Sequence, residues 1–124
     1  MNCYEKQLKE QDVRQKRWTA VVSAAIGEVE VALLKRRPGF LHTTFFGAMG
    51  IDPKHLAIWC FFKMDRDLKD AKEEHFTEVV NQAMRDGLQK HGYPGFLLPS
   101  FFVSFATDED VQKTCGGNYY HYLK

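Results

Sequence analysis

The chain has 124 residues, which is the length of one domain with a single hydrophobic core. Apolar residues make up 44% of it and charged residues 27%, a balance that is typical of an ordered globular protein and argues against intrinsic disorder. The formal net charge of +1 gives no general field for attracting polyanions, so binding to nucleic acid or to a membrane surface would need a local basic patch.

A long amphipathic helix is predicted first. Its apolar side chains recur at helical spacing, and Pro38-Gly39 ends the pattern. The repeating positions are Trp18, Val22, Ala25, Ile26, Val29 and Leu33. Residues 1–17 form a charged leader, in which Leu8 and Val13 are the only apolar anchors from Glu5 to Arg17. We therefore expect this leader either to project beyond the core as helix or to fray.

Two stretches rich in aromatic and β-branched residues follow, "FLHTTFFGAM" from residue 40 and "HLAIWCFFKM" from residue 55. Between them lies "GIDPK", whose Gly50 and Pro53 favour a turn. The pattern predicts an antiparallel β-hairpin.

A second helix is predicted over residues 65–91. One apolar stripe runs along it, carboxylates occupy its first turns, and Gly92 with Tyr93-Pro94 ends it. The stripe consists of Leu68, Ala71, Phe76, Val79, Val80, Ala83, Met84 and Leu88.

The C-terminal part is predicted to hold a third strand, a short helix and an aromatic tail. Residues 100–106, "SFFVSFA", read as the strand, with Phe101, Val103 and Phe105 on one side. Thr107 caps a helix from Asp108 to about Cys115, which Gly116-Gly117 end. The predicted fold is α+β, a two-layer sandwich in the order α-β-β-α-β with an antiparallel hairpin, a short C-terminal helix and the tail.

The hairpin is expected to present two different faces. With Phe46 placed near His55, one face is an apolar core surface and the other is aromatic with polar groups among the rings. The core face carries Leu41, Thr43, Phe45, Leu56, Ile58, Cys60 and Phe62. The second face carries His42, Thr44, Phe46, His55, Ala57, Trp59, Phe61 and Lys63. Because the helices need only one face, the second should be covered by the tail, a second copy, another protein or a ligand.

Several chemistries are disfavoured by residue placement. Cys115 is predicted at a helix C-terminus, where the negative end of the helix dipole disfavours the thiolate. Cys115 is therefore not expected to act as a nucleophile with His121 as its base. No histidine and cysteine spacing fits a metal site, so we predict no metal and no cofactor. The best basic patch, Lys35 to Arg37, is expected to complement its own helix dipole, and the predicted strands lack an RNA-recognition signature, so nucleic acid is not the expected partner.

The cellular compartment and the number of domains are predicted from sequence features that are missing. There is no apolar run long enough to cross a bilayer, and the polar start has no signal-peptide core. Three cysteines at wide spacings do not form a secreted disulfide framework. We expect one α+β domain over residues 1–124, located in the cytoplasm, with reduced thiols.

Two hypotheses for function remain. The first is a small protein-binding module, an inhibitor or immunity-type protein acting by surface complementarity, whose aromatic face binds a protein partner or a second copy as a homodimer. Its predicted binding residues are His42, His55, Trp59, Phe61, Tyr119, Tyr120 and Tyr122. The alternative is a small enzyme that uses His42 or His55 as acid-base, with tyrosine donors, in a cleft beside the same face. No catalytic residue is predicted under the first hypothesis.

Overall fold

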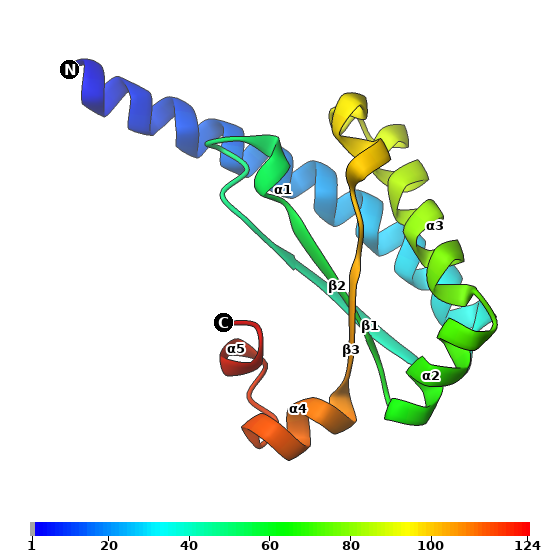
Figure 1. The fold of residues 1–124 in the computed structure, drawn as a ribbon. Helices are drawn as coiled ribbons and strands as arrows, with labels where there is room; N and C mark the ends of the chain where they lie inside the picture. Colours follow the sequence, from blue (N-terminus) through cyan, green and yellow to red (C-terminus); the bar gives the residue numbers. More distant parts are fainter. Residues whose placement is uncertain (1) are drawn as a thin grey trace.

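The fold is α+β, with five α-helices, two 3₁₀ turns and a three-stranded sheet in residues 2–124, which the computed structural model describes (Figure 1). The helices are α1 (Cys3–Arg36), α2 (Asp65–Glu73), α3 (Phe76–Lys90), α4 (Asp108–Cys115) and α5 (Tyr119–Tyr122). The strands are β1 (Phe40–Phe46), β2 (Ala57–Phe62) and β3 (Ser104–Thr107), and the 3₁₀ turns are η1 (Pro53–His55) and η2 (Gly95–Ser100). The predicted order of elements is confirmed.

The sheet has the order β1-β2-β3, with β1 antiparallel to β2 as predicted for the hairpin. β3 returns parallel to β2 after the crossover through α2 and α3. The larger core lies between one face of the sheet and α1 and α3, which is consistent with the expected two-layer arrangement. A smaller core lies on the other face, where α4 and the C-terminal tail pack.

Helix α1 begins at a capped end, because the side chain of Asn2 accepts a hydrogen bond of 2.8 Å from the Glu5 amide. Its apolar stripe is buried from Val22 to Leu33, whereas Tyr4 and Leu8 near its start are exposed. From Cys3 onward the leader is helical, and it extends past the sheet (Figure 1). It is attached through Gln15, whose amide side chain donates to the Gly47 carbonyl and accepts from the Gly50 amide.

The predicted helix over residues 65–91 is divided into α2 and α3 at His75, which has a positive φ of 60°. The apolar stripe of this segment explains why the helix is divided. Ala71 and Phe76 are both buried, but five positions separate them, so an unbroken helix would turn their side chains about 140° apart. The left-handed residue between the two helices lets both side chains reach the core.

Strand β3 begins at Ser104, four residues later than predicted. Two side chains of α3 take the backbone groups that precede it: Asn81 accepts from the Val103 amide at 2.7 Å, and Arg85 donates to the Phe101 carbonyl at 2.9 Å. These groups are bound to a helix and are not available to β2. Ser100, the first residue of the predicted strand, is the last residue of η2, which spans Gly95–Ser100.

The hairpin register differs from the prediction at both ends. Phe46 lies opposite Ala57 and not opposite His55, which belongs to η1 before the strand. A register shift between Phe40 and His42 turns Phe40 into the core in place of Leu41, which is exposed. In between, Thr44 faces Trp59 and His42 faces Phe61, so the central residues keep their predicted faces.

Three predicted glycine stops are confirmed, since Gly92, Gly116 and Gly117 all have positive φ just beyond a helix. Thr107 caps α4 as predicted, accepting a 3.0 Å hydrogen bond from the Asp110 amide. No helix within residues 2–124 combines the length and the apolar character needed to cross a membrane.

Candidate protein-binding surface

Phe61 lies at the centre of the sheet face turned away from α1 and α3, which we call the aromatic face. The face is formed by His42, Thr44, Phe46, Ala57, Trp59 and Phe61. Phe61 is fully buried and packs against Tyr119 and Tyr122, with ring centroids 5.0 and 6.3 Å away. The tail therefore covers this face within the same chain, which was one of the four coverings that the sequence left open.

The rings around Phe61 form one continuous layer. His42 stacks on Phe61 at 4.9 Å and lies 5.2 Å from Tyr119. On the other side, Trp59 lies 6.2 Å from Phe61 and meets the edge of Tyr122 at 6.4 Å. His42 and Trp59 are half-buried. This packing explains how an aromatic sheet face is stabilised without the main helices.

The tail reaches this layer because of two local turns. Gly116 and Gly117 end α4 with positive φ, and Asn118 caps α5 by accepting from the His121 amide at 3.1 Å. Tyr119 and Tyr122 are three positions apart in α5, so both rings lie on the side that faces the sheet. Tyr120, between them, is 70% exposed.

The half-buried Tyr119 and Tyr122 each also bond to a carboxylate in the first turn of α4. The phenol of Tyr119 donates to Asp108, and that of Tyr122 donates to Asp110 at 2.6 Å. Burial, with the hydrogen bond and charge of Asp108, raises the pKa of Tyr119 well above its usual value. Burial, with the same effects from Asp110, raises the pKa of Tyr122 to about 12. Both phenols therefore remain protonated donors at neutral pH.

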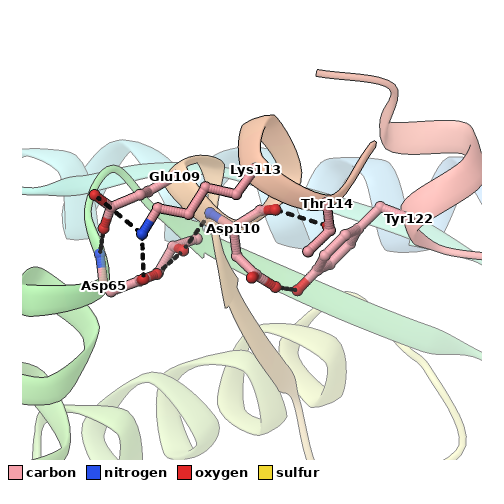
Figure 2. A network of polar contacts seen from close by, with 7 residues as sticks. Asp65, Glu109, Asp110, Lys113, Thr114 and Tyr122 are labelled. Carbon is pink, nitrogen blue, oxygen red and sulfur yellow. Dashed lines mark hydrogen bonds and ion pairs between the residues drawn. The ribbon is translucent and has the colours of Figure 1, made fainter. Parts of the chain in front are cut away.

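A polar network links α4 to the start of α2 (Figure 2). Thr107 donates to the carboxylate of Asp65 at 2.5 Å, and the Asp65 amide donates to Glu109 at 2.8 Å. Lys113 lies 3.7 Å from Asp65 and 3.9 Å from Glu109. The Thr107 hydroxyl, followed by the charge of Lys113, holds the pKa of Asp65 below its usual value. These carboxylates are bound within the fold, so we assign the network to positioning α4 and not to catalysis.

An apolar strip remains open where the tail meets the hairpin. Phe46 is 46% exposed and Tyr120 is 70% exposed, and they line an open hollow together with Leu123 and Lys124. We call these four residues the Tyr120 strip. Large apolar side chains that gather at a surface mark interaction sites more often than scattered ones do.

The seven predicted binding residues divide into three groups. His42, Trp59, Phe61, Tyr119 and Tyr122 are brought together in the aromatic layer. Tyr120 lies on the surface. The placement of His55 on this face is wrong, because His55 ends η1 and its backbone precedes the strand. Neither histidine lines the hollow, so the cleft that the enzyme hypothesis requires is not formed by His42 and His55 there.

Sequence reasoning left out Phe46 and Leu123 as binding residues. Phe46 was assigned to the correct face of the sheet. Its exposure depends on how far the tail extends over that face, and the spacing of apolar residues in the sequence does not predict this. The three-residue spacing of Tyr119 and Tyr122 is a signal that separates them from Tyr120 on a helix. That signal predicts two covering rings and one exposed ring.

Other candidate chemistries find little support in residues 2–124. No group of three or more histidine, cysteine or carboxylate side chains there is arranged to hold a metal ion. In the basic patch at the end of α1, Arg37 forms an ion pair with Glu74 and lies over the ring of Phe76 at 5.3 Å. Comparisons of the chain with protein-family models, with curated proteins and with solved structures gave no match.

Proposed function

We propose that this chain is a small cytosolic protein-binding module of the inhibitor or immunity type, which acts by surface complementarity through the Tyr120 strip and the adjoining rim of the aromatic face. The single observation that carries the proposal is the exposure of Phe46 and Tyr120 together, with Leu123, around one hollow. Aromatic residues are enriched in the cores of protein interfaces, and tyrosine is among the residues that most often contribute a large share of the binding energy.

The hydrogen bonds that fix α5, the helix that carries Tyr120, are a second argument for this proposal. Tyr120 is flanked in α5 by two tyrosines that are fixed by hydrogen bonds, so its backbone is held in place before any partner arrives. A preformed surface loses less conformational entropy on binding than a mobile tail does. The thiols of Cys3, Cys60 and Cys115 are unpaired, which suits a reducing compartment.

The test is affinity purification from the native host with three forms of the chain. Tyr120→Ser removes the exposed ring of the strip, whereas Phe96→Ser removes a ring that is 82% exposed and belongs to η2, a segment that lies away from α5 (Figure 1). We expect a stoichiometric partner that the parent chain and Phe96→Ser retain and Tyr120→Ser loses.

A partner retained equally by all three forms would overturn the assignment of the strip. Thermal melting of the two variants accompanies the experiment, since both substitutions change exposed side chains and should leave the melting temperature within a few degrees of the parent chain.

A further inference from the structure

We infer that the outer edge of β1 pairs with the same edge of a second copy of this chain, forming an antiparallel dimer centred on Thr44. The inference rests on the proposed function for one point alone, namely that the region around Phe46 binds a protein. Its own basis is the backbone of β1, which the proposed function does not use.

The first observation is an open row of backbone groups. β1 is the outermost strand and pairs with β2 on one side only. Within residues 2–124, the main-chain groups of residues 41–46 take part in no hydrogen bond outside the β1–β2 ladder. An edge of this kind is a template for another strand, and it fits an extended backbone better than any other ligand.

The second observation is that β1 lacks the usual protection of an edge. Its sequence, "FLHTTFF", contains no lysine, no carboxylate and no proline. The one irregularity is the register shift between Phe40 and His42, which leaves residues 42–46 as a regular segment. Charged residues or proline would normally interrupt such a segment at a free edge.

The third observation selects a second copy as the occupant. An uncharged segment can pair with itself across a two-fold axis without bringing like charges together. The midpoint of residues 42–46 is Thr44, so two-fold pairing sets Thr44 opposite Thr44 and Phe46 opposite His42 of the other copy. Phe46 and His42 lie on the same face of the sheet, as opposed residues in antiparallel strands must.

This register gives the exposed ring of Phe46 a place to pack. In the dimer it would lie against His42, which already stacks on Phe61 and borders Tyr119. The two aromatic layers would then become continuous through a six-stranded sheet. The dimer would bury Phe46 of the Tyr120 strip but leave Tyr120 outside the strand pairing, so a substitution at Tyr120 tests the partner surface without changing the dimer.

The experiment uses the purified full chain without any partner. We expect a dimer in sedimentation equilibrium and, on raising the protein concentration, added hydrogen-exchange protection of the amides of β1 that point away from β2. Phe46→Ala should weaken dimerisation about tenfold or more, while Tyr120→Ser should leave it unchanged.

Two single-cysteine variants test the register in a background with Cys3→Ser, Cys60→Ala and Cys115→Ser, because the Thr43 hydroxyl lies 3.9 Å from the Cys60 sulfur and a cysteine at position 43 could otherwise oxidise with Cys60 in the same chain. Thr44→Cys lies on the two-fold axis and should give a covalent dimer on mild oxidation, whereas Thr43→Cys, on the opposite face and off the axis, should not. A chain that stays monomeric at every concentration would overturn the inference. So would a dimer whose β1 amides gain no protection, or one in which the two cysteine variants cross-link equally.

If dimerisation fails while Tyr120→Ser still abolishes partner capture, only the inference is lost. If partner capture fails and the dimer forms through β1, only the proposed function is lost.

Discussion

Tyr122 donates a 2.6 Å hydrogen bond to Asp110, twelve positions earlier in the chain, and this bond attaches the tail to the first turn of the helix that precedes it. Tyr119 makes the equivalent bond to Asp108. The carboxylates have a second role there, because negative charge at a helix N-terminus stabilises the helix. The same two residues thus stabilise α4 and hold the rings that cover Phe61.

Tyr122→Phe is expected to loosen the tail without removing its ring. The variant loses a hydrogen bond to a carboxylate in a half-buried site, which should lower the free energy of unfolding by about 1–2 kcal/mol. The amides of α5 should exchange faster than in the parent chain, as measured by hydrogen exchange. Tyr120→Phe is the matched control, since its hydroxyl makes no such bond within the described residues and its loss should change neither quantity.

Stability is expected to fall in alkaline solution because of the covered tyrosines. Burial raises the pKa of Tyr93 and of Tyr122 to about 12, against about 10 in an unfolded chain. The folded state therefore holds these protons more tightly, so their contribution is complete below pH 10 and is lost between about pH 10 and 12. Urea unfolding across this range should show the loss, and Tyr122→Phe should make it smaller. A free energy of unfolding that is flat across this range would contradict the assignment.

The central part of the fold follows from local patterns that the tertiary structure does not override. Val22, Ile26 and Leu33 are buried on α1 at their predicted helical spacing, and Ile58 and Cys60 point to the core at their predicted alternation. Helical and strand periodicities are properties of the backbone, so a sequence with consistent spacing predicts which side is buried.

The errors arise where one long-range contact replaces a local preference. Asn81 takes the Val103 amide, so the strand starts late, and the register shift after Phe40 exposes Leu41. The burial of Phe76 requires a left-handed backbone conformation at His75. No proline or glycine at that position indicates a break in the helix. The same holds for the candidate surface: the aromatic face could be predicted, but the Tyr120 strip depends on how far the tail extends across it.

Cys3 and Cys60 should react with a thiol-specific dye in an order set by their exposure. Cys3 is exposed at the start of α1 and should be labelled first. Cys60 is fully buried, and burial raises the pKa of its thiol to about 12, so it should react only when the sheet opens. Mass spectrometry of peptides at increasing times gives the order. Labelling of Cys60 as fast as Cys3 under native conditions would show that the core is open.

Two glycines with positive φ should differ in their tolerance of alanine. At Gly92 a Cβ would meet no atom within 4 Å, so Gly92→Ala should cost only the backbone strain, about 1–2 kcal/mol. At Gly47 a Cβ would lie 2.1 Å from the His55 carbonyl oxygen, and Gly47→Ala should cost about 3 kcal/mol or more. Urea unfolding of both variants measures the difference, and equal costs would contradict the close approach of the two loop segments.

The last prediction separates the covered part of the aromatic face from its exposed rim. Trp59 packs on Tyr122 with ring centroids 6.4 Å apart, so a double-mutant cycle of Trp59→Ala and Tyr122→Ala should give a coupling of about 0.5–1.5 kcal/mol in unfolding. The cycle of Trp59→Ala and Tyr120→Ala should be additive, because Tyr120 is 70% exposed and points away from the layer. Trp59→Ala alone should cost less than Phe61→Ala, for which the loss of a fully buried ring predicts about 3–5 kcal/mol. If Trp59 were additive with Tyr122 and coupled to Tyr120, the tail would lie on the sheet in another orientation, and both the Tyr120 strip and its proposed partner surface would have to be reassigned.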